Sequence, residues 1–97
     1  MTPEDILARV TANAAALRRL GARRLRLFGS AARRETSEPA DLDFLVDLQP
    51  KTFDAYMDVK AFLEDLFGRP VDLVIAEAVK PALRQRILEE AVDAPGL

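Results

Sequence analysis

RLRLFGSAARRETSEPADLDFLVDL, residues 24–48, is the stretch that decides the expected fold. Its first residues alternate between arginine and leucine, and this period of two predicts a half-buried strand over Arg24–Phe28. Residues 41–48 also alternate, with apolar side chains on one face and three aspartates and Leu45 on the other. Between the two predicted strands we expect a helical turn over Ala31–Arg34 and a loop over Glu35–Ala40, where Thr36, Ser37 and Pro39 disfavour regular structure.

The flanking segments predict three helices and one more strand. Thr2 is suited to cap a helix that runs to Gly21, Thr52 is suited to cap a second that runs to Gly68, and Pro81 is suited to open a third. Helical spacing predicts that the second helix buries Phe53, Tyr56, Val59, Phe62, Leu63 and Leu66. For the last helix it predicts a core face of Leu83, Ile87, Leu88 and Ala91. Val71–Ile75 is typical of a short strand.

This order of elements predicts an α/β fold, a three-stranded mixed sheet with helices packed on it. The sheet is expected to be mixed because only one connection is long enough for a parallel crossover. With 97 residues, we expect a single domain over 1–97.

Composition excludes several chemistries. The chain has no cysteine and no histidine, so disulfides, thiol nucleophiles, serine–histidine triads and sites built on thiolate or imidazole are excluded, and any metal must bind oxygen ligands. The acidic N-terminus and the lack of a long apolar run predict no secretion signal and no membrane span, so we expect a cytoplasmic protein.

Charge is unevenly distributed along the sequence. Residues 1–34 carry a net charge of +6 and residues 35–97 a net charge of −8, within an overall charge of −2. This asymmetry indicates either a surface that attracts an anion or ordinary solvated helix faces. The low pI of 5.1 and the absence of aromatics within the basic segment argue against a nucleic-acid partner.

Three aspartates on predicted strands are candidate ligands. Asp41 and Asp43 project from the same face of one strand, where ionised carboxylates repel each other unless a cation such as Mg²⁺ offsets the repulsion. Asp72 would supply a third carboxylate if its strand is the neighbour of the first. The alternative is that these acids lie on the solvated face of an edge strand.

The Gly29-Ser30 turn is a candidate phosphate site. It follows a strand and precedes a helical turn, an arrangement that presents backbone N–H groups to a phosphate, and Arg33 and Arg34 would lie nearby. An ordinary turn with exposed arginines is the alternative. No Walker A lysine follows the glycine, which excludes that motif.

Taken together, Gly29-Ser30, ten intervening residues, Asp41-Leu42-Asp43 and the later Asp72 resemble the signature of minimal nucleotidyltransferases of the DNA polymerase β-like superfamily. The likeness covers nearly the whole chain. Small members of that family are antitoxins encoded beside an all-helical HEPN-domain ribonuclease toxin, and they transfer AMP from ATP to a tyrosine of that toxin. The resemblance thus implies a protein adenylyltransferase that forms a complex with such a toxin.

The resemblance also implies roles for the matching residues. Gly29 and Ser30 would hold the β- and γ-phosphates of ATP, with Arg33 and Arg34 beside them. The three aspartates Asp41, Asp43 and Asp72 would bind two Mg²⁺ ions, and Asp72 would also serve as base for the acceptor proton.

Two positions depart from the family pattern, which usually has glycine at Arg34 and serine at Ala40. Neither change removes a metal ligand, so we expect them to affect turnover more than nucleotide binding. A non-catalytic antitoxin that acts by binding alone and a nucleotidyltransferase with another acceptor, such as tRNA, are the alternative functions.

Overall fold

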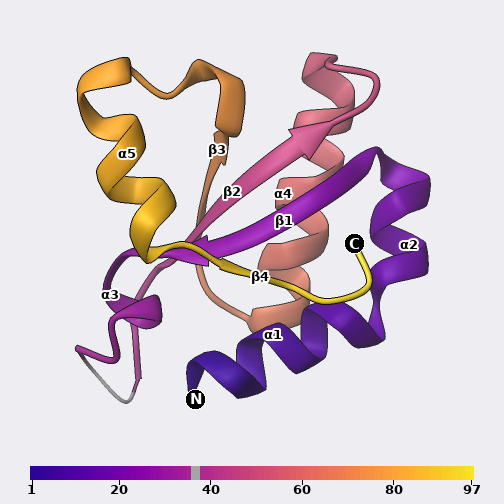
Figure 1. The fold of residues 1–97 in the computed structure, drawn as a ribbon. Helices are drawn as coiled ribbons and strands as arrows, with labels where there is room; N and C mark the ends of the chain where they lie inside the picture. Colours follow the sequence, from indigo (N-terminus) through magenta and orange to yellow (C-terminus); the bar gives the residue numbers. More distant parts are fainter. Residues whose placement is uncertain (36–37) are drawn as a thin grey trace.

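A four-stranded sheet with helices on both faces forms the protein, as a computed structural model of residues 1–35 and 38–97 shows (Figure 1). Thr36 and Ser37 of the predicted loop lie outside the described residues. The elements in chain order are α1 (Pro3–Ala12), α2 (Ala14–Leu20), β1 (Ala22–Phe28), α3 (Gly29–Ala32), β2 (Leu42–Leu48), α4 (Phe53–Phe67), β3 (Val71–Ile75), the 3-10 turn η1 (Ala76–Ala78), α5 (Pro81–Glu90) and β4 (Val92–Asp93).

The sheet has the strand order β3-β2-β1-β4. β1 pairs antiparallel with both β2 and β4, whereas β2 and β3 are parallel and are connected through α4. The predicted mixed α/β sheet is confirmed, but its expected strand number of three is wrong. β4 has two residues, which is too short for an alternating pattern to be visible in the sequence.

Capping residues set most helix boundaries as the sequence predicts. The Thr2 hydroxyl accepts a hydrogen bond from the backbone N–H of Asp5, and the Thr52 hydroxyl accepts one from Ala55. The first predicted helix is in fact two, because the chain breaks at Asn13, whose side-chain amide donates to the carbonyl of Arg9 instead of continuing the helix.

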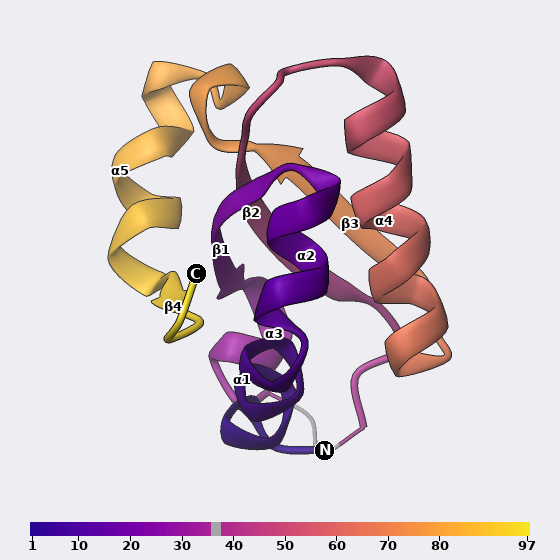
Figure 2. The same ribbon diagram turned by 90° about the vertical axis from the view of Figure 1, so that its right-hand side faces the viewer.

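The main core lies between the sheet and the helices α1, α2 and α4, which cover one face (Figure 2). The inward-facing residues of β2, Leu42, Phe44 and Val46, are completely buried, and the ring of Phe44 stacks on that of Phe67. The expected burial of Phe53 is wrong, since 75% of it is exposed at the first turn of α4. Among the described residues, no helix is long and apolar enough to cross a membrane.

α5 lies alone on the opposite face of the sheet (Figure 2). The predicted core face of this helix is wrong for Leu83 and Leu88, which are 51% and 38% exposed. No residue of α5 is fully buried, and Ile87 is half-buried. Polar contacts at the end of α5 therefore matter for holding it against the sheet.

Candidate active site

The candidate site residues meet at the edge of the sheet where β1 ends and β2 and β3 begin. In the parallel pair of β2 and β3, Asp43 lies directly opposite Asp72, and in the antiparallel pair of β1 and β2 it lies opposite Phe28. Because paired residues project from the same face of a sheet, the two carboxylates are neighbours. The adjacency of their strands, which the sequence prediction assumed, is confirmed.

Gly29 brings the backbone of α3 against Asp43. The helical turn begins at Gly29 itself, two residues earlier than predicted, and Gly29 has a φ of +77°. A Cβ atom at this position would lie 2.1 Å from Oδ2 of Asp43, which is far inside van der Waals contact. The fold therefore requires glycine here for both backbone conformation and space, and it fixes the carboxylate of Asp43 against the turn.

Negative charge is concentrated around Asp43. Burial raises the pKa of Asp43 above its usual range, and the nearby carboxylates of Asp72 and Asp41 raise it further, while Arg33 partly opposes them. Asp41 and Asp72 themselves are exposed. The site thus carries an excess of carboxylate charge that only a cation or a proton can offset.

The donor set at this edge suits a hard divalent cation, because three carboxylates supply oxygen ligands and their mutual repulsion would be relieved by one. In residues 1–35 and 38–97, however, no three acidic side chains are gathered closely enough to hold a metal ion as they stand. Binding of Mg²⁺ would therefore require the side chains of Asp41, Asp43 and Asp72 to turn toward one another. Their role as ligands stays a prediction.

Glu90, at the end of α5, is a site residue that sequence reasoning missed. Its Oε1 accepts a hydrogen bond of 3.2 Å from the backbone N–H of Gly29, and both of its carboxylate oxygens lie 3.0 Å from Nη1 of Arg33. The Glu90 carboxylate thus binds two of the four residues that the sequence predicts to hold phosphate, Gly29 and Arg33. No local pattern signals this contact, since Glu90 lies 61 residues from Gly29 in the sequence.

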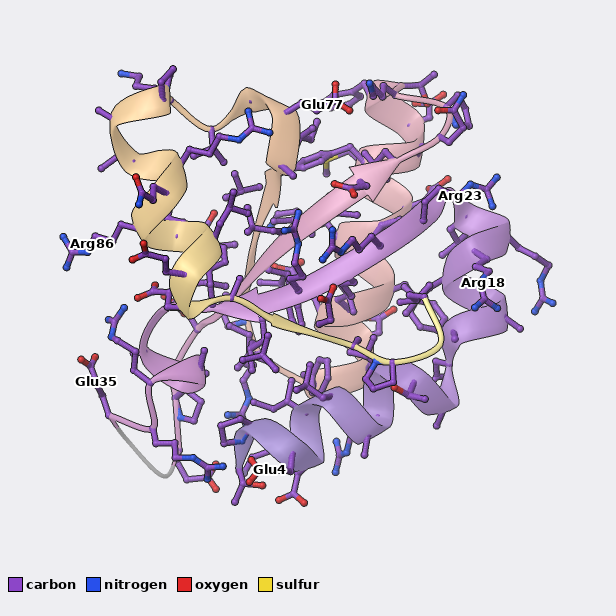
Figure 3. The ribbon with its side chains drawn as sticks, in the orientation of Figure 1. Glu4, Arg18, Arg23, Glu35, Glu77 and Arg86 are labelled. Atoms are coloured by element: carbon purple, nitrogen blue, oxygen red, sulfur yellow. The ribbon has the colours of Figure 1, made fainter. Side chains whose placement is uncertain are left out.

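Arg33 is held between two acids. Its guanidinium also donates to Glu35 through Nε and Nη2, and hydrogen bonds to Glu35 and then to Glu90 raise the pKa of Arg33 above its usual value. Because Glu35 belongs to the loop that follows α3, this ion pair connects the loop to the end of α5. Figure 3 shows Glu35 at the lower left, below α5.

Arg34 points elsewhere. Its guanidinium pairs with Glu4 of α1, which Figure 3 shows at the start of that helix. Its φ of +60° is the left-handed conformation that glycine adopts most readily, so the chain keeps a glycine-type backbone at this position. Ser30, beside Gly29, is half-buried. The nucleotide-binding roles of Gly29, Ser30, Arg33 and Arg34 stay predictions.

Comparison with known proteins decides the family. Residues 19–92, from the end of α2 to the start of β4, match the family described as polymerase beta, nucleotidyltransferase. The chain belongs to the polymerase β-like nucleotidyltransferases. The matched region includes every candidate residue of the site, and the predicted family and fold class are confirmed.

Two relatives show the likeness at the level of whole chains. Protein adenylyltransferase MntA of Thermococcus cleftensis is 35% identical over 94 residues, which is 95% of each chain. A chain of Methanocaldococcus jannaschii, provisionally named a protein adenylyltransferase, is 39% identical over 74 residues, or 75% of this nucleotidyltransferase and 80% of the relative.

Solved structures agree with this assignment. A structure provisionally described as a minimal nucleotidyltransferase superimposes with a TM-score of 0.79 at 40% identity and covers 95% of both chains. A toxin–antitoxin structure with AMP-PNP superimposes with a TM-score of 0.68 over 90% of this chain and 73% of the other. At 20% identity, this second likeness shows the fold alone.

The contact between Gly29 and Asp43 can be tested by substitution. Gly29→Ala is expected to destabilise the protein more than Gly68→Ala, because both glycines have positive φ but a Cβ on Gly68 meets no atom within 4 Å. We expect Gly68→Ala to cost about 1 kcal/mol and Gly29→Ala about 1–3 kcal/mol more. Urea unfolding of both variants measures the difference, and equal costs would contradict the contact.

The charge on Asp43 predicts a pH-dependent stability. The pKa of Asp43 in the folded protein lies above the unfolded value of 3.8. The free energy of unfolding therefore falls as pH rises from 3.8 through the pKa of the folded protein. At neutral pH without divalent cations, Asp43→Asn should therefore stabilise the protein by about 0.5–1 kcal/mol, an advantage that disappears at acidic pH. Thermal unfolding in chelator measures this, with Asp65→Asn on the exposed side of α4 as control; a variant that melts no higher than wild type at neutral pH would contradict it.

Proposed function

We propose that this nucleotidyltransferase is an Mg²⁺-dependent antitoxin that transfers AMP from ATP to a tyrosine of a HEPN-type ribonuclease toxin and thereby neutralises it. The observation that carries the proposal is the cross-strand pair of Asp43 and Asp72 beside the Gly29 turn. The relative named protein adenylyltransferase MntA, alike along nearly the full length of both chains, supports AMP transfer to a protein acceptor.

The reaction replaces one bond to the α-phosphorus of ATP. The tyrosine oxygen of the acceptor forms a bond to that phosphorus, the bond to the oxygen bridging to the β-phosphorus breaks, and pyrophosphate leaves. Divalent cations, when bound by Asp41, Asp43 and Asp72, supply charge stabilisation for the attacking and the leaving oxygen. The tyrosine proton would pass to a carboxylate at the rim of the site, a role that the family resemblance gives to Asp72, which is exposed.

The phosphates of ATP would be held by the Gly29 N–H and by Arg33. These groups already bind an anion, the carboxylate of Glu90, so their geometry suits negatively charged oxygen. ATP must therefore displace Glu90 before its phosphates occupy the turn. This exchange predicts that α5 lowers the affinity for nucleotide while Glu90, at its end, is bound to Gly29 and Arg33.

Transfer itself is tested with labelled ATP, Mg²⁺ and a HEPN-type ribonuclease toxin as the acceptor. Wild type should label the toxin on tyrosine, and Asp41→Asn or Asp43→Asn should lower the rate at least about a hundredfold, because removal of a group that stabilises transition-state charge has an effect of this size. Asp54→Asn, an exposed aspartate in the first turn of α4, serves as control.

Two outcomes would contradict the proposal. Transfer that survives both substitutions would show that these carboxylates take no part in the reaction. If the Asp41→Asn variant transfers no label but still neutralises the toxin in cells, the protein would instead be an antitoxin that acts by binding alone.

The competition between Glu90 and phosphate gives a separate prediction. Glu90→Gln keeps the side-chain size but removes its charge, so ATP should bind about threefold to tenfold more tightly than to wild type. Glu89→Gln, an exposed neighbour, should leave the affinity unchanged. Titration of ATP by calorimetry measures both. Weaker binding by Glu90→Gln would show that Glu90 supports nucleotide binding by orienting Arg33.

A further inference from the structure

A basic cleft lies on the same face of the sheet as Asp43, at the opposite end. It has a volume of about 490 Å³ and is bounded by α5, by η1, and by the start of β1 and the end of β2. Its basic residues are Arg23, Arg24, Arg26, Lys51 and Arg84, against two acids, Asp47 and Glu77. The cleft therefore has a formal net charge of +3 in a chain whose overall charge is −2.

Arg26 lines this cleft with an unsatisfied donor. Its side chain is 12% exposed, and Nε is buried with no hydrogen-bond partner in the described part of the chain. Arg26 forms a long ion pair with Asp47, whose carboxylate lies 3.8 Å from Nη2 of Arg26. A buried donor without a partner is costly, and the long contact with Asp47 compensates the charge of Arg26 only in part.

The rim of the cleft carries further positive charge. Arg24 is paired with Asp93 and Lys51 with Glu77, but Arg23 and Arg84 are exposed and form no ion pair with residues 1–35 or 38–97. Figure 3 shows Arg23 at the start of β1 and Glu77 at the same end of the molecule. Two arginines are thus available to a ligand from outside.

We propose that this cleft binds an acidic segment of the acceptor protein. The proposal rests on the proposed function, because it assigns the second substrate of that reaction to a surface. Asp43 and Asp47 lie four residues apart on β2, about 13 Å along the strand. Leu45, between them on this face, is 1% exposed, so the strand is covered there. An acceptor with acidic side chains in the cleft would therefore pass around α5 to bring another of its residues to the Asp43–Asp72 pair.

A nucleic acid fits the same face less well. Its backbone would have to pass from the basic cleft to the edge where Asp41, Asp43 and Asp72 gather negative charge, which repels phosphates that no bound cation neutralises. A peptide carries acidic side chains over the cleft only and presents a neutral residue at the aspartates. Charge complementarity along the face therefore favours a protein segment.

The test measures peptide binding without nucleotide or Mg²⁺. The probe is a fluorescein-labelled peptide of four glutamates, a neutral four-residue spacer and one tyrosine, and its binding is followed by anisotropy at low salt. We expect the Arg23→Gln, Arg84→Gln double variant to bind about threefold to tenfold more weakly than wild type. The Arg18→Gln, Arg86→Gln double variant removes the same charge from side chains that point away from the sheet in Figure 3, and it should bind like wild type.

Each other result overturns the proposal. No measurable binding, equal weakening in both double variants, or equal binding of a peptide with glutamines in place of the glutamates would show that the cleft does not select an acidic segment. Tighter, cleft-dependent binding of a single-stranded oligonucleotide of equal charge would assign the cleft to nucleic acid. Circular dichroism confirms that the variants, changed only at exposed residues, remain folded.

The outcome is separable from that of the proposed function. The Asp41→Asn, Asp43→Asn variant lacks two carboxylates of the site but keeps the cleft, so it should bind the peptide at least as tightly as wild type. Cleft-dependent peptide binding without any transfer of AMP to the toxin would leave this inference standing and remove the proposed reaction. Transfer of AMP to the toxin without peptide binding would leave the proposed reaction standing and remove this inference.

Discussion

The register between β2 and β3 is the constraint on which the site depends. Leu42, Phe44 and Val46 must face the core, and a slip of one residue would turn all of them to the other face. In this register Asp43 lies directly opposite Asp72. The hydrophobic core thus holds two like charges together, and burial of apolar surface offsets their repulsion.

Gly29 adds a second constraint at the same point. Its lack of a side chain allows the turn after β1 to contact the Asp43 carboxylate, so a backbone N–H group and a carboxylate lie side by side. Neither feature alone distinguishes a site from an ordinary turn or a charged strand end. Their contact does, because it gathers a donor for anions and a ligand for cations within one edge of the sheet.

Much of the fold follows from local pattern, but contacts between distant elements do not. Alternation predicts β1, β2 and β3, and threonine caps predict the starts of α1 and α4, because these signals arise within a few residues. Leu83 and Leu88 have helical spacing, yet periodicity does not say whether another element covers that side of α5. The partner of Gly29 is Glu90, and only the packing of α5 across the sheet brings them together.

α5 belongs to both functional regions of the same face. Its last residue, Glu90, binds the Gly29 turn, while Arg84 and Leu88 line the basic cleft. With no fully buried residue, the helix depends on a few polar contacts for its position, and such elements detach at lower free energy than packed ones. An acidic segment bound at Arg84 would act on the helix whose end occupies the phosphate turn, so acceptor and nucleotide would be coupled through α5.

Arg34 shows how the site tolerates a departure from the family pattern. The backbone there keeps a left-handed φ, which costs a non-glycine residue on the order of 1 kcal/mol. The side chain that replaces the usual glycine turns away from Gly29 and pairs with Glu4 on α1. Arg34 therefore connects the loop to the first helix, while the turn against Asp43 keeps the positive φ of Gly29.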